Sequence, residues 1–100
     1  MLDMSVTVTG GQGETQFPVA FHARLTLLCV EVPSGTNPTY GFNISDPQGN
    51  VLYGQNPITG NVSITEDVRI VSNTYSPTLN VVSATSDGVY LFRFYQHGDV

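Results

Sequence analysis

The chain has 100 residues, of which 40 % are hydrophobic and 11 % charged, and its formal net charge is −5. This length has room for one core, so we expect a single domain over residues 1–100 that is neither disordered nor membrane-spanning. Its only Lys or Arg residues are three arginines, which argues against binding nucleic acids or anionic membranes, since both need clustered positive charge.

Apolar and polar residues alternate at period two along most of the chain, which predicts β-strands and no helix of useful length. In chain order, we expect strands at residues 5–9, 24–32, 40–44, 51–53, within 62–71, 78–83 and 89–95. The breaks between them are rich in Gly, Pro, Asn, Asp and Ser, and include residues 10–13, 33–38, 46–50, 56–60 and 85–88. Short strands separated by turns at this spacing predict an all-β antiparallel sandwich.

The glycine cluster at residues 10–13 has the composition of a phosphate-binding loop. It lacks the Gly-Lys-Ser/Thr that completes such a loop, and no helix is expected to follow it. We therefore interpret it as a flexible kink.

Catalytic and metal sites find no support in the sequence. Cys29 is the single cysteine, so we expect no internal disulfide and no cysteine metal cluster, and its apolar neighbours predict a buried thiol. His22 and His97 lie far apart, and no nucleophile elbow is present. The carboxylates, which include Asp46 and Glu66-Asp67, do not have calcium-loop spacing. We expect no enzymatic activity, metal or cofactor.

The segment at residues 76–92 resembles the E-to-F region of immunoglobulin V-set domains, with the pattern Asp-x-Gly-x-Tyr-x-Cys. Gly88 and Tyr90 match that pattern, Ser86 holds the acidic position with Asp87 one residue late, and Phe92 stands in place of the cysteine. The resemblance implies that the hydroxyl of Tyr90 bonds back to the backbone of the preceding loop.

The earlier half of the chain is also similar to this family. Leu25-x-Leu27-x-Cys29 resembles strand B with its cysteine, and Phe42 stands where the family has a buried tryptophan. The resemblance implies that Cys29 and Phe92 face one another between the two sheets. Burial of the Phe92 ring would stabilise the fold by roughly 1.5–3 kcal/mol, whereas a disulfide stabilises by about 2–4 kcal/mol. The resemblance also implies that Arg69 pairs with Asp87, or with Ser86 if the register is strict. The alternative is an unpaired surface arginine.

Only five residues follow Tyr95, too few for the last strand of a V-set domain. We therefore expect an immunoglobulin-like, V-set-like sandwich with a short or missing final strand. The edge of the strand at residues 89–95 would then be open to pairing with another chain.

Asn43-Ile44-Ser45 and Asn61-Val62-Ser63 are N-glycosylation acceptor patterns. Together with the expected fold they favour an extracellular location as part of a cell-surface protein. The sequence itself contains neither a signal peptide nor an apolar run near the roughly 20 residues of a spanning helix.

Leu91, Arg93 and Tyr95 should point away from the core on the strand at residues 89–95, and Tyr53 would join the same face if its side chain points outward. This composition is typical of protein interfaces, although isolated exposed apolar residues are also normal.

The resemblance implies a recognition or adhesion domain of a cell-surface receptor, similar to the atypical domains of cnidarian allorecognition receptors. Its partner would be another immunoglobulin-like domain, including a second copy of itself. The alternatives are a structural spacer or assembly domain completed by a partner's strand, and an enzyme or carbohydrate-binding module.

Overall fold

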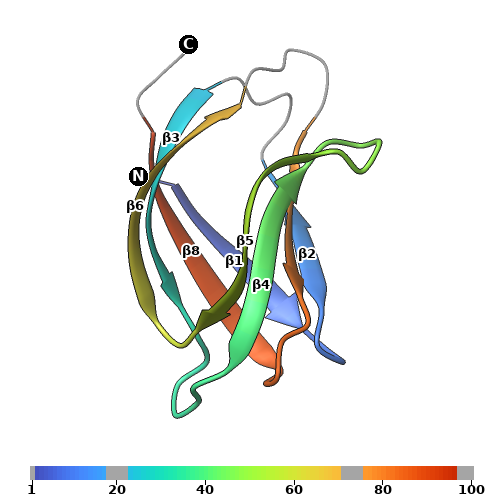
Figure 1. The fold of residues 1–100 in the computed structure, drawn as a ribbon, viewed down its shortest axis with the longest axis vertical. Helices are drawn as coiled ribbons and strands as arrows, with labels where there is room; N and C mark the ends of the chain where they lie inside the picture. The colour runs from blue at the N-terminus through green and yellow to red at the C-terminus, as the bar shows by residue number, and fades with distance from the viewer. Residues whose placement is uncertain (1, 18–22, 71–75, 97–100) are drawn as a thin grey trace.

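The computed structural model describes residues 2–17, 23–70 and 76–96, with the backbone alone at 23, 24, 66–70 and 96. These residues form eight strands and no helix. The strands are β1 (Leu2–Val8), β2 (Gly13–Gln16), β3 (Ala23–Glu31), β4 (Thr39–Ser45), β5 (Val51–Thr59), β6 (Val62–Ile70), β7 (Thr78–Val82) and β8 (Gly88–Gln96). They make two four-stranded antiparallel sheets that pack face to face (Figure 1). The all-β sandwich predicted from the sequence is thus confirmed.

The strand order is β1-β8-β3-β6 in one sheet and β2-β7-β4-β5 in the other. Strands pair as β1 with β8, β2 with β7, β3 with β6 and β4 with β5. The chain is therefore one long antiparallel hairpin, with its tip between β4 and β5, wrapped so that β8 also meets β3 and β7 also meets β4. This is the strand order of an eight-stranded jelly roll.

This arrangement differs from the V-set arrangement that the sequence resemblance implies. In a V-set domain, the strands corresponding to β3 and β8 lie in opposite sheets. Here they are hydrogen-bonded neighbours, and Cys29 pairs with Arg93 while Val30 pairs with Phe92. Cys29 and Phe92 therefore do not face one another across the sandwich.

The expectation of an open edge on the strand at residues 89–95 is also wrong. β8 pairs with β1 on one side and with β3 on the other, so both of its hydrogen-bonding edges are occupied. The described edge strands are β1, β6, β2 and β5. β2 was not expected from the sequence, because its four residues, Gly13–Gln16, are mostly polar.

A β-bulge at Leu28 explains the position of Cys29. Leu25 and Leu27 are fully buried, and strict alternation would bury Cys29 next. The register of β3 shifts between Leu27 and Cys29, so Val30 takes the inward place instead. A one-residue shift moves a side chain to the other face of a sheet. Cys29 is therefore a partly exposed free thiol beside Arg93, and the prediction of a buried core thiol is wrong.

Aromatic rings from the two sheets meet in the middle of the sandwich. Phe42 of β4 packs edge-on against Phe92 of β8, with ring centroids 5.2 Å apart. Tyr40 makes the same kind of contact with Tyr90 at 5.1 Å. All four rings are buried. Such pairs add about 0.5–1.5 kcal/mol each beyond the area that they bury.

Both buried tyrosines place their hydroxyl groups on backbone carbonyls. The hydroxyl of Tyr90 donates to the carbonyl of Ser86 at 2.7 Å, which is the loop bond that the resemblance implies. The hydroxyl of Tyr40 donates to the carbonyl of Gly60 at 3.0 Å, and burial raises the pKa of Tyr40 to about 12. Burial also raises the pKa of Tyr90. Burial disfavours the phenolate because its charge loses contact with water.

The turn predicted at residues 46–50 is the tip of the hairpin. The carboxylate of Asp46 accepts hydrogen bonds from the backbone N–H groups of Gln48 and Asn50. It also accepts one from the side chain of Asn50 at 2.9 Å, and this bond is the main reason that the pKa of Asp46 is lowered.

The glycine cluster is an ordered corner rather than a flexible kink. Gly10 and Gly11 both have positive φ, and their N–H groups each donate to the carboxylate of Asp87 at 3.1 Å. The backbone of Ala84 donates to the carbonyl of Gly11 at 2.8 Å. Successive N–H groups of this kind form an anion-binding nest, and here the protein's own carboxylate fills it. The predicted partner of Asp87, the side chain of Arg69, lies outside the described residues.

We predict that Asp87→Ala lowers the free energy of unfolding by about 1–2 kcal/mol, because two N–H groups lose a charged acceptor at an exposed corner. Asp87→Asn keeps the shape and one acceptor oxygen, so its loss should be smaller. Chemical denaturation of the three proteins measures both effects. Equal stability of Asp87→Ala and the parent would contradict this role for the carboxylate.

We also predict that stability falls as pH rises from about 10 toward 12. The folded pKa of Tyr40 lies above its unfolded value of 10.0, so its contribution is complete below pH 10 and is lost as the pH approaches 12. This difference corresponds to roughly 3 kcal/mol. Tyr40→Phe should be less stable than the parent at neutral pH, because the carbonyl of Gly60 loses its donor. It should show a shallower alkaline decline in denaturation experiments, and identical declines would refute the assignment.

Candidate recognition surfaces

The alternating side chains of β8 produce an exposed stripe on the outside of the first sheet. Tyr90, Phe92 and Phe94 point inward and are fully buried. The residues between them point outward, and we call them the β8 stripe: Val89, Leu91, Arg93 and Tyr95. Val89 is 53 % exposed and Tyr95 50 %, Arg93 is exposed and Leu91 is half-buried. Leu91, Arg93 and Tyr95 are three of the interface residues expected from the sequence, and the structure brings them together.

Charged and small polar side chains border the stripe on both sides. On β1, Asp3 is the cross-strand partner of Arg93, and on β3 Glu31 lies two pairs further along, opposite Leu91. The guanidinium of Arg93 lies 3.7 Å from the carboxylate of Asp3 and 3.5 Å from that of Glu31. These are exposed ion pairs without short hydrogen bonds, and each contributes about 0–1 kcal/mol.

Tyr53 does not belong to this face. It lies on β5, in the other sheet, where its half-buried ring packs 6.0 Å from that of Phe42. Its hydroxyl accepts a hydrogen bond from the side chain of Gln55 at 2.8 Å. The expectation that Tyr53 joins Leu91, Arg93 and Tyr95 is therefore wrong, because β5 and β8 are in opposite sheets.

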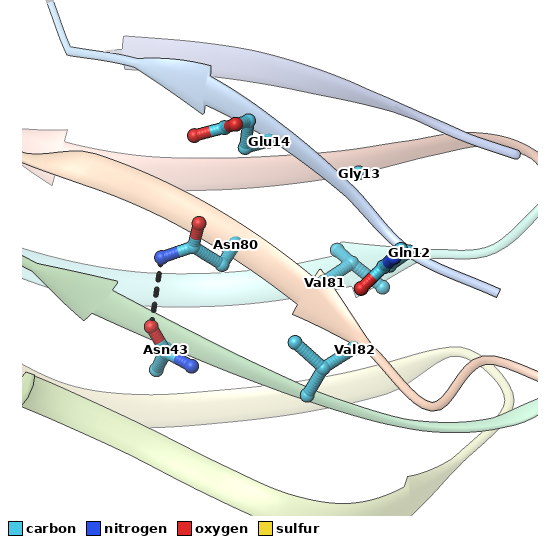
Figure 2. A pocket seen from close by; sticks show the side chains of 7 residues that line it. All are labelled: Gln12, Gly13, Glu14, Asn43, Asn80, Val81 and Val82. Atoms are coloured by element: carbon cyan, nitrogen blue, oxygen red, sulfur yellow. Dashed lines mark hydrogen bonds between the residues drawn. The ribbon is translucent and has the colours of Figure 1, made fainter. Parts of the chain in front are cut away.

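The outer face of the second sheet has a different character. A shallow cleft of about 430 Å³ lies over β2, β7 and the middle of β4, lined by Gln12, Gly13, Glu14, Asn43, Asn80, Val81 and Val82 (Figure 2). A second depression of about 280 Å³ continues toward β5, lined by Phe42, Asn43, Val51, Gly54, Gln55, Asn56 and Val82. Since Asn43 and Val82 line both, the two depressions form one groove across the sheet, which we call the amide groove.

A side-chain network fixes the middle of the amide groove. The amide nitrogen of Asn80 donates to the amide oxygen of Asn43 at 2.8 Å and to the hydroxyl of Ser45 at 3.0 Å. Gly41 lies under the side chain of Asn56, which a Cβ at that position would meet at 2.5 Å. This site was not predicted from the sequence. The alternation around Asn43 and Asn80 puts both side chains outside, but only the pairing of β4 with β7 brings them together.

The two glycosylation candidates lie in different surroundings. Asn61 is exposed beside the turn between β5 and β6, and its amide oxygen accepts the backbone N–H of Val32 at 2.8 Å. Asn43 is half-buried in the middle of the second sheet, and its amide nitrogen faces the cleft (Figure 2). A glycan is attached to this nitrogen, so one on Asn43 would fill the groove.

Among the residues that the structure describes, no group of three or more His, Cys, Asp or Glu side chains is arranged to hold a metal ion. The same part of the chain has no helix long and apolar enough to cross a membrane. His22 and His97 lie outside the described residues.

We predict that secretion from eukaryotic cells gives a domain that carries a glycan at Asn61 and none at Asn43. Glycopeptide mass spectrometry measures the occupancy of each site. Asn61→Gln should abolish the mass shift of the folded protein, while Asn43→Gln should leave it. A folded product with a glycan on Asn43 would contradict this prediction.

Compared with protein-family models, with curated proteins and with solved structures, the chain finds no match. What this domain does therefore has to be inferred from the chemistry of its two faces.

Proposed function

We propose that this domain is a recognition module of an extracellular, cell-surface protein, and that it binds a second copy of itself through the β8 stripe. The observation that supports this most is the exposure of Val89 and Tyr95 on one strand, with Leu91 and Arg93 between them. Aromatic residues and arginine are enriched at protein interfaces and supply most of their binding energy.

The position of the stripe favours contact between faces. β8 lies between β1 and β3, so the stripe runs along the interior of the sheet and not along its edge. Its apolar members are flanked by small polar residues, with Thr7 opposite Val89 and Ser5 opposite Leu91. A partner can therefore approach the stripe along its length without meeting bulky neighbours on β1.

The charges around Arg93 make the surface complementary to a copy of itself. One guanidinium lies between the carboxylates of Asp3 and Glu31. When two copies meet about a two-fold axis, the same patch faces itself, so a patch that carries both signs offers each arginine the partner's carboxylates. A partner surface that carries charge of only one sign would place like charges opposite either the arginine or the two carboxylates.

The exposed acceptor pattern at Asn61 supports the extracellular part of the proposal. The alternative of a domain completed by a partner's strand has lost the observation that favoured it, since both edges of β8 are paired.

We predict that the domain self-associates and that Tyr95→Ala and Arg93→Glu each weaken association at least tenfold, a loss of about 1.4 kcal/mol or more. Tyr95→Ala removes an exposed ring from the stripe, and Arg93→Glu places three carboxylates together. Sedimentation over a concentration series measures the dissociation constant, and aggregation of beads that display the domain tests the same contact between surfaces.

Two variants serve as controls. Leu52→Ala removes an exposed apolar side chain from β5, in the other sheet, and Gln48→Glu adds negative charge at the distant β4–β5 turn. Both should associate like the parent. A folded parent that stays monomeric at millimolar concentration and fails to aggregate beads would reject self-recognition.

A further inference from the structure

The amide groove lies on the face opposite the β8 stripe and has no part in the function proposed above. It crosses the sheet from β2 to β5, and its two depressions share Asn43 and Val82. Its length runs across the strands, so it presents side chains from four of them to one elongated ligand. A groove of this form is suited to an extended molecule.

The lining residues limit the chemistry of such a ligand. Gln12, Asn43, Asn80 and Asn56 supply side-chain amides, each with a donor and an acceptor group. Among the described residues, the lining contains one carboxylate, Glu14, and no Lys or Arg. An anionic ligand would therefore meet negative charge without a compensating cation, and a wholly apolar ligand would cover polar groups without satisfying them. A neutral ligand with many hydroxyl groups matches this lining.

The network at the centre orients its amides before any ligand arrives. Because Asn80 uses its nitrogen to bond Asn43 and Ser45, its oxygen is turned the other way, toward Glu14 (Figure 2). Asn43 uses its oxygen, which turns its nitrogen toward the side of the cleft where Val82 lies (Figure 2). An acceptor and a donor are thus fixed on neighbouring strands, and fixing them in advance reduces the entropy lost on binding.

Apolar side chains lie between and beside these amides. Val82 stands where the two depressions meet, and Val51, which is 62 % exposed, lines the depression beside β5. A sugar ring has hydroxyl groups around its edge and C–H groups on its faces. It can therefore bond to the amides while one face contacts a valine.

We propose that the amide groove binds a neutral oligosaccharide, with Asn43, Asn80 and Glu14 bonding its hydroxyl groups and Val82 in contact with a ring face. The absence of cations from the lining predicts that sulfated or sialylated forms of the same sugars are rejected. A glycan attached to Asn43 would compete for the same space.

Titration of the ¹⁵N-labelled domain with short neutral gluco-, manno-, galacto- and xylo-oligosaccharides at millimolar concentration tests the proposal by two-dimensional NMR. At least one sugar should shift the amide signals of Gln12, Glu14, Asn43, Asn80 and Val82 in a saturable way. Asn80→Ala should weaken that binding roughly tenfold or more, since a fixed acceptor and its network are lost. Glu14→Gln keeps a hydroxyl-bonding group without the charge and should lessen the rejection of anionic sugars.

Tyr95→Ala, on the opposite face, is the matched control and should bind the sugar like the parent. The spectrum of each variant reports its folding independently of ligand. The proposal is overturned if no neutral sugar shifts the groove signals of the folded parent. It is equally overturned if the shifts occur only at the β8 stripe, or if extended peptides shift the groove signals and sugars do not. Self-association is tested by changing Tyr95 and sugar binding by changing Asn80, and these residues lie in different sheets. Either proposal can therefore fail while the other stands.

Discussion

The structure depends on the aromatic contacts between its two sheets. Phe42 meets Phe92 and Tyr40 meets Tyr90, so two residues of β4 are matched with two of β8 at the same spacing. These contacts join the sheets without a covalent bond between them. They also fix which side of each strand faces outward, because neighbouring residues point to opposite faces. The stripe on β8 and the groove over β4 are thus the outer sides of the two strands whose inner sides hold the sandwich together.

The sequence predicted the local structure better than the arrangement of the strands. Period-two alternation located most strands and gave the outward direction of Leu91, Arg93 and Tyr95, and turn-forming residues located the tip at residues 46–50. Alternation states which side of a strand is buried but not which strand lies beside it. The V-set motif around Gly88 and Tyr90 was matched locally, and the bond from Tyr90 to Ser86 is present, yet β8 pairs with β3. Tyr53 was assigned to the wrong face for the same reason.

The remaining differences have physical causes that a single sequence does not display. The bulge at Leu28 reverses the side of Cys29, and a bulge inserts one residue without a distinctive composition. β2 has only four residues, none of them buried, and two of them, Gly13 and Glu14, line the groove. The residues of the groove come from four strands that are separated in the sequence. No single stretch of sequence therefore contains enough of them to form a motif. Sites of this kind become visible only when the strand order is known.

The place of β8 in its sheet also has a consequence for how the protein folds. β8 is the last strand in the described part of the chain, and it lies between β1 and β3, with Leu2 paired to Phe94. During synthesis, β1 and β3 leave the ribosome long before the strand that joins them. Pairings between residues so distant in sequence slow folding, because a large loop must close before they form. Until then both strands present unpaired edges, so this part of the nascent chain is most exposed to aggregation just before β8 appears.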